Sequence, residues 1–100
     1  MSESSAEGVQ VRDRPDRSRY VAEVGGAQAG FAAYRLRGSD VIVFTHTEVD
    51  PAFEGQGVGS ALARDALDDV RRRGLHLIAL CPFISAYIRR HPEYADLIAP

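Results

Sequence analysis

His46 and Glu48 stand two residues apart in the run VIVFTHTEV, Val41 to Val49. If this run is a strand, both side chains point to one face unless a bulge intervenes. An imidazole or a carboxylate can take a proton from a reacting group, directly or through water. The spacing predicts a candidate general base on the strand, and the alternative is a polar strand end with ordinary hydrogen bonds.

A glycine-rich loop, EGQGVGSAL, follows this run at residues 54–62. Gly55, Gly57 and Gly59 alternate just before a run typical of a helix. The first N–H groups of a helix have no internal partners and its dipole is positive there, and glycines without Cβ let an anion approach them. A tight turn would need only one glycine, so the alternation predicts a phosphate or pyrophosphate site.

The loop does not match the usual nucleotide motifs. A P-loop needs a lysine, and the chain has none. The dinucleotide fingerprint is G-x-G-x-x-G with an acid at the end of the next strand. Here the spacing is G-x-G-x-G, and the next apolar run ends in Cys81. Nucleotide binding therefore stays only as a weaker hypothesis.

The elements around these residues change from strands to helices along the chain. Four strands are expected, at Val9–Arg14, 18–24, Ala27–Arg37 and Val41–Val49, in an antiparallel meander. A helix from Val58 to a stop at Gly74, a buried strand at 75–81 and a helix at 83–90 follow. The strands at 41–49 and 75–81 flank a helix and must be parallel with a right-handed crossover. This order predicts an α/β (α+β) fold.

Length and composition set wider limits. One hundred residues predict one domain, at residues 9–100, after a disordered polar tail at residues 1–8. A net charge of −2 predicts no nucleic-acid and no membrane partner. The single Cys81 and the lack of a long apolar run favour a cytoplasmic protein. His76 and His91 lie too far apart for a metal-ligand spacing, so no metal is expected.

The glycine loop after THTEVDPAF resembles the acetyl-CoA-binding motif of the GNAT superfamily of N-acetyltransferases, written Q/R-x-x-G-x-G/A. Gly57 and Gly59 match its small positions, whereas Glu54 replaces the usual Gln or Arg and removes one phosphate-facing side chain. Together HTEV, GVGS, LCPF and AYIRRHPEY resemble a short single-domain branch that lacks the helices after the first strand. The resemblance covers roughly residues 9–97 and implies a minimal GNAT-like fold.

The resemblance implies acetyl-CoA as cofactor, with its pantetheine arm between splayed strands at 41–49 and 75–81. It places a carbonyl-polarising backbone N–H near Thr47 to Val49 and cofactor contacts at Cys81 and Tyr87. The loop residues that would hold the cofactor's phosphates are Gln56, Gly57, Val58, Gly59 and Ser60.

The implied reaction is attack of an amine on the thioester. Glu48 or His46 would take the amine's proton, and Tyr87 stands where many members carry a tyrosine that protonates the thiolate. The alternative for Tyr87 is a packed aromatic residue. Cys81, in CPF, would contact the cofactor; a nucleophilic role would need a lowered pKa, and the sequence shows no adjacent cation.

The resemblance therefore implies an N-acetyltransferase that acts on an amine of a small molecule or a protein. The short chain has little material to enclose a small substrate, which favours an exposed protein acceptor. The alternative is a non-catalytic coenzyme A-binding or protein-interaction module. The oligomeric state stays open.

Overall fold

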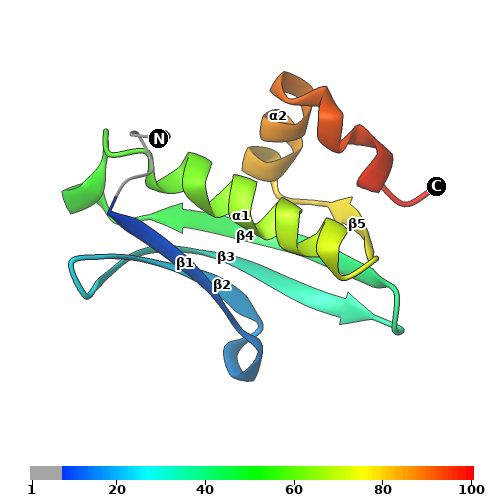
Figure 1. The fold of residues 1–100 in the computed structure, drawn as a ribbon, viewed down its shortest axis with the longest axis horizontal. Helices are drawn as coiled ribbons and strands as arrows, with labels where there is room; N and C mark the ends of the chain where they lie inside the picture. The colour runs from blue at the N-terminus through cyan, green and yellow to red at the C-terminus, as the bar shows by residue number, and fades with distance from the viewer. Residues whose placement is uncertain (1–7) are drawn as a thin grey trace.

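The computed structural model describes residues 8–100, so most of the tail expected at residues 1–8 lies outside the described residues (Figure 1). One mixed sheet has the strand order β1-β2-β3-β4-β5. Neighbours among β1 to β4 are antiparallel, and β5 runs parallel to β4. The strands are β1 (Val9–Arg14), β2 (Arg19–Val24), β3 (Ala27–Arg37), β4 (Val41–Val49) and β5 (His76–Ala79). The predicted α+β class and the parallel β4–β5 pair are confirmed.

Two helices follow the meander, α1 (Val58–Arg72) and α2 (Pro82–Arg90). Short 3-10 helices lie at Pro15–Arg17 (η2), Pro51–Phe53 (η3) and Pro92–Leu97 (η4). The predicted helix start at Val58 and the stop at Gly74 hold, since Gly74 adopts a φ of 71° just beyond α1. No helix in residues 8–100 is long and apolar enough to cross a bilayer.

The strand expected at 75–81 is shorter in the structure, and the helix expected at 83–90 begins one residue earlier. β5 stops at Ala79, and Pro82 is the first residue of α2, with Cys81 as its N-cap. Proline suits that position because its missing N–H would be unpaired there anyway.

Both helices lie on the same side of the sheet (Figure 1). Ile42 and Phe44 of β4 point into the core below them and are fully buried. Leu62, Ala66 and Val70, spaced along one face of α1, are buried in the same cluster. The opposite face of the sheet, which we call the open face, has no helix over it in the described part of the chain. The sheet thus has one covered and one accessible side.

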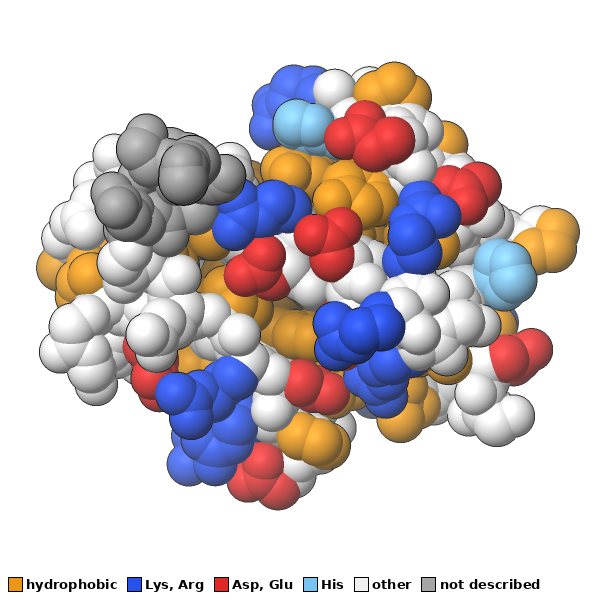
Figure 2. Space-filling model, viewed as in Figure 1, with side chains coloured by type: hydrophobic (Ala, Val, Ile, Leu, Met, Phe, Trp, Pro, Cys, Tyr) orange, Lys and Arg blue, Asp and Glu red, His pale blue; other side chains and the backbone are white. Residues whose placement is uncertain are grey.

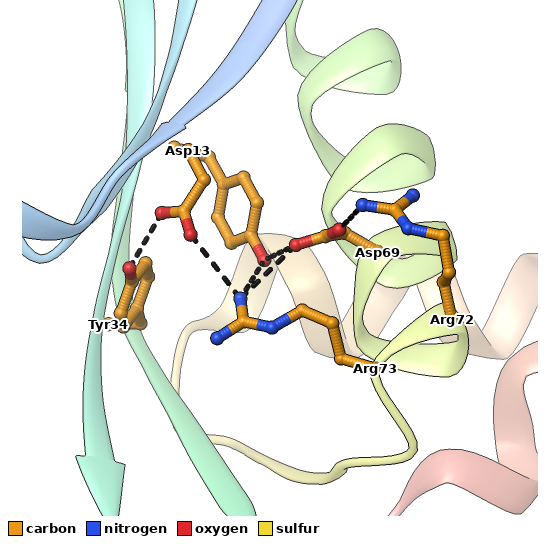
Figure 3. Close-up of polar contacts among 6 residues, drawn as sticks. Asp13, Tyr34, Asp69, Arg72 and Arg73 are labelled. Carbon is orange, nitrogen blue, oxygen red and sulfur yellow. Dashed lines mark hydrogen bonds and ion pairs between the residues drawn. The ribbon is translucent and has the colours of Figure 1, made fainter.

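A polar network anchors the C-terminal half of α1 to the sheet (Figure 3). The Tyr20 hydroxyl donates to Asp69 at 2.6 Å, and the Tyr34 hydroxyl donates to Asp13 at 2.6 Å. Arg73 reaches both carboxylates, at 3.3 Å from Asp13 and 3.2 Å from Asp69. Burial, and then the Asp13 charge, raise the pKa of Tyr20 to about 12. Arg73 therefore ties the end of α1 to β1 and β2, through Asp13 and Tyr20.

The end of the chain closes the outer edge of β5. Ile98 forms a parallel bridge with Leu77, and the Ala99 N–H donates to the Leu77 carbonyl at 2.8 Å. Just before this bridge, η4 brings Tyr94 and Leu97 into the core.

Candidate functional site

β4 and β5 part after a short paired stretch. Their parallel register runs from Val41 opposite His76 to Phe44 opposite Ala79. The Phe44 carbonyl then accepts from the N–H groups of both Leu80 and Cys81, at 3.0 and 3.1 Å. Beyond this point β4 continues to Val49, paired with β3 alone among the described residues. The divergence leaves one edge of β4, at residues 45–49, free to pair with an extended ligand.

A bulge in β4 sets which side chains line the gap. The β3–β4 register passes from Tyr34 opposite Phe44 to Ala33 opposite His46, so Thr45 has no partner in β3. The extra residue shifts the alternation of side chains, so that Thr47 and Val49 follow Phe44 onto the core side. The Thr47 hydroxyl lies 3.2 Å from the Cys81 sulfur, across the gap. These two residues, predicted to contact the cofactor, are therefore brought together.

The glycine loop ends at the N-terminus of α1. Asp50 caps η3 by accepting from the Ala52 N–H at 2.9 Å, and the chain then turns through Gly55 and Gly57, with φ of 84° and 78°. Gly57 is the N-cap of α1 and supplies no side-chain cap, and no acidic residue occupies the first turn. The positive end of the helix dipole is thus uncompensated within the described residues, an arrangement that suits an anion.

Each glycine of the loop also has a structural reason. Gly55 and Gly57 both need the left-handed backbone, so the expectation that one glycine would make the turn is wrong. A Cβ on Gly59 would lie 2.8 Å from the Phe83 ring, so Gly59 lets the starts of α1 and α2 approach. The alternation by itself is weaker support for an anion site than the uncapped helix end.

His46 and Glu48 meet on the open face. The His46 Nε2 lies 2.9 Å from a Glu48 carboxylate oxygen, and the two side chains are 58% and 62% exposed. The bulge precedes both residues, so they share a face as predicted. The centroids of the His46 and Phe31 rings lie 6.0 Å apart, and the Arg19 guanidinium lies 4.0 Å from the centroid of the same Phe31 ring. The pair can hold and pass a proton at the surface of the sheet.

Tyr87 lies on the helix side. It is 6% exposed, and its ring stacks on His91 at 4.1 Å between centroids and tilts against Tyr94 at 6.2 Å. Burial raises the pKa of Tyr87, so its hydroxyl stays protonated well above neutral pH. Among residues 8–100, no hydrogen bond joins this hydroxyl to Thr47, Cys81 or the His46–Glu48 pair, so the structure does not bring Tyr87 into contact with them.

Three residues at the site have roles that were not predicted from the sequence. Phe83 sets the spacing of the two helices, Phe31 supports His46, and a Cβ on Gly30 would lie 2.6 Å from the Glu48 carbonyl oxygen. Phe83 stands in the LCPF motif but had no role predicted, and Phe31 and Gly30 stand in no motif, although a glycine inside a strand is a recognised sign of close backbone approach. Within the described residues, no group of three His, Cys, Asp or Glu side chains is placed to hold a metal ion.

The face that carries α1 has mixed charge. Figure 2 shows arginines interleaved with acidic side chains across it. A hollow of about 480 Å³ lies between β1 and α1, and the acidic side chains around it contact Tyr or Arg partners, as Asp69 does with Tyr20 and Asp68 with Tyr94. No single sign of charge dominates this side.

Comparisons with known proteins agree with this geometry. The family described as GCN5-related N-acetyl-transferase matches residues 19–97. The human protein NATD1 is 28% identical over 99 residues, which cover 94% of this chain and 88% of that protein. A GCN5-like protein from Staphylococcus aureus has the same fold, with a TM-score of 0.69 at 21% identity, over 93% of this chain and 90% of that one.

A third similar structure contains coenzyme A. Rv2747 from Mycobacterium tuberculosis, solved in complex with CoA, is 29% identical with a TM-score of 0.60, over 75% of this chain and 47% of that one. The resemblance seen in the sequence is confirmed: this chain belongs to the GCN5-related N-acetyltransferase family.

Proposed function

We propose that this protein transfers an acetyl group from acetyl-CoA to an exposed amine of a protein. The observation that carries the proposal is the free edge of β4 at residues 45–49, which leads to the uncapped start of α1. An extended ligand with amides would pair with that edge, and its anionic end would reach the N–H groups of Val58, Gly59 and Ser60. Acetyl-CoA has this layout, with a pantetheine arm that ends in a pyrophosphate.

The chemistry divides between the two faces of the sheet. The amine nitrogen forms a bond to the thioester carbonyl carbon, the carbon–sulfur bond breaks, and the sulfur leaves as thiolate. On the open face, Glu48 or His46 takes the proton that the amine loses. On the helix side, Tyr87 donates a proton to the thiolate, for which its raised pKa keeps it in the required form. A backbone N–H between Thr47 and Val49 polarises the carbonyl.

The first test is calorimetric titration with acetyl-CoA, with NAD and ATP as controls. Acetyl-CoA should bind saturably and the two nucleotides should not. Gly57→Asp places a carboxylate at the start of α1 and should weaken binding at least about tenfold, because it repels the pyrophosphate. Gly25→Asp is the matched control, since Gly25 also has a positive φ and open space around its Cβ. Equal loss in both variants would contradict the proposed phosphate site.

A non-catalytic coenzyme A-binding module remains the second candidate. Glu54 puts a carboxylate where the family motif usually has Gln or Arg, and the His46–Glu48 pair is largely exposed rather than enclosed. Release of free coenzyme A in the presence of an amine and peptide panel separates the two candidates. Binding without product from any acceptor would favour the module.

A further inference from the structure

A groove on the open face has a composition that the proposed catalytic residues do not explain. It encloses about 590 Å³ beside the point where β4 and β5 part, and Thr45 and Leu80 stand at that point. It contains two arginines, three aliphatic side chains and one hydroxyl. The lining residues are Arg35, Leu36, Arg37, Val43, Thr45 and Leu80.

The two arginines have no acidic partner. Arg35 and Arg37 are exposed, and neither makes an ion pair within residues 8–100. This sets them apart from Arg71 and Arg73, which bind carboxylates of neighbouring elements. Unpaired guanidinium groups attract carboxylates and bind them in a fork geometry. Positive charge is therefore available for a ligand at this place.

Apolar surface adjoins the charge. Leu36 and Leu80 are 57% and 66% exposed, although most large aliphatic side chains of the protein are buried. Val43 points to this face because its neighbours Ile42 and Phe44 point into the core. By the same alternation Leu36, opposite Ile42, lies on the helix side of β3, so the exposed apolar side chain on the open face is Leu80, beside Val43. Leu80 offers a partner an apolar contact next to the charge.

The spacing of the arginines suits an extended peptide. Arg35 and Arg37 lie on one face of β3, two residues apart, which is roughly 7 Å along a strand. Acidic side chains at alternate positions of an extended peptide have the same spacing. The charge and the spacing both complement an Asp/Glu-x-Asp/Glu segment.

We propose that this groove docks the acceptor: an extended acidic segment of another protein, with acids at alternate positions next to the amine that is acetylated. The inference rests on the proposed acetyl transfer, because docking beside Thr45 and Leu80 brings an amine to the end of the β4–β5 gap. His46 and Glu48 lie on the same face and reach that amine from the adjoining part of β4.

The test measures peptide binding separately from catalysis. Dye-labelled peptides with one lysine followed by Glu-Ala-Glu, by Gln-Ala-Gln or by adjacent Glu-Glu are titrated into the full chain with coenzyme A present. The Glu-Ala-Glu peptide should bind most tightly. Arg35→Glu/Arg37→Glu should weaken it at least about tenfold, because it replaces attraction by repulsion.

The matched control is Arg17→Glu/Arg90→Glu, which makes the same charge change at two exposed arginines outside the groove. It should leave peptide binding within about twofold, since surface charges at a distance are screened. Leu80→Ser should weaken the peptide without any change of charge. Coenzyme A binding, titrated in parallel, should stay the same in every variant, so that a failed cofactor site and a failed groove are told apart.

Three results would overturn the assignment. If both double variants weakened binding of the Glu-Ala-Glu peptide equally, the attraction would be unspecific. If the Gln-Ala-Gln peptide bound as tightly as the Glu-Ala-Glu peptide, the arginines would have no role in recognition. A dimer in sedimentation that Arg35→Glu/Arg37→Glu dissociates would assign the groove to a second copy of this chain.

Discussion

The Thr47 hydroxyl and the Cys81 sulfur lie 3.2 Å apart across the gap between β4 and β5. The contact joins the bulged strand to the residue that caps α2, at the place where we propose that the thioester lies. A buried thiol held by a neighbouring hydroxyl packs as a small apolar group, which suits contact with a cofactor better than attack on it.

Cys81 is therefore expected to form no acetyl-enzyme. Mass spectrometry after incubation with acetyl-CoA alone should show no hydroxylamine-sensitive acetyl group on the protein. The chain contains no lysine, so no label can sit on a lysine side chain, and peptide mapping assigns any acetyl group to its residue. Cys81→Ser should keep turnover within about tenfold, because it preserves a polar contact to Thr47. A thioester adduct that Cys81→Ser abolishes would make Cys81 the nucleophile.

The His46–Glu48 pair should govern turnover and not cofactor binding. Glu48→Gln and His46→Ala are each expected to lower kcat about 10²-fold, the low end for loss of a general base. Acetyl-CoA titrations should be unchanged, since both side chains lie on the open face. Glu93→Gln is a suitable control, because Glu93 also lies near a histidine, His91 at 3.8 Å, but on the helix side. Unchanged turnover in both variants would remove the pair from the reaction.

Tyr87→Phe should lower kcat and leave the affinity for acetyl-CoA within a few-fold. The raised pKa of Tyr87 means that its ionisation should cause no loss of activity up to about pH 10, its ordinary value. Tyr94→Phe is the control, since its hydroxyl donates to Asp68 at 2.6 Å and its loss should cost stability rather than turnover. Full activity of Tyr87→Phe would leave Tyr87 as a packing residue.

Gly59→Ala should destabilise the fold by about 1–3 kcal/mol, because its methyl group would collide with the Phe83 ring 2.8 Å away. Urea unfolding measures the change. The double variant Gly59→Ala/Phe83→Leu should recover part of the loss, since the shorter side chain makes room. If the losses in the free energy of unfolding of the two single variants simply add in the double variant, Gly59 and Phe83 do not interact.

The buried tyrosines should make the protein sensitive to alkali. Burial raises the pKa of Tyr20 to about 12. The pKa of Tyr34 is raised further, by burial and the hydrogen bond to Asp13, and so is that of Tyr94, by burial and the hydrogen bond to Asp68. Groups with raised pKa values in the folded state contribute stability that is present below the unfolded value of 10.0 and lost as pH rises through the folded value.

Urea midpoints should therefore stay level up to about pH 10 and fall above it. Tyrosine absorbance should titrate late in the folded protein and normally in urea. Tyr20→Phe should be less stable at neutral pH and show a shallower fall. A midpoint that rises above pH 10 would contradict the direction of these pKa values.

The sequence predicted the elements whose signal is local, namely hydrophobic periodicity and the glycines that end an element. The β-branched run of β4, the three- and four-residue steps of α1 and the stop at Gly74 are local features, and the parallel β4–β5 pair follows from the helix between them. The shared face of His46 and Glu48 follows from their spacing alone.

The bulge at Thr45 had no such signal. It depends on how β4 registers against β3, which is a property of two strands together. Spacing alone separates Thr47 from His46 and Glu48, but the bulge decides that Thr47 takes the helix side, with Cys81, and that His46 and Glu48 take the open face. The bonds of Tyr20 with Asp69 and of Arg73 with Asp13 join residues far apart in the chain and were equally hidden.

The bridge between Ile98 and Leu77 also bears on the behaviour of the protein at high concentration. β5 is the outermost strand on its side of the sheet, and an uncovered strand edge is a template onto which another chain can add. The last residues occupy part of that edge through the Ile98 bridge and the Ala99 hydrogen bond. Ile98 and Ala99 thus leave less of this edge open to pairing with another chain, on the strand that also forms one wall of the proposed cofactor gap.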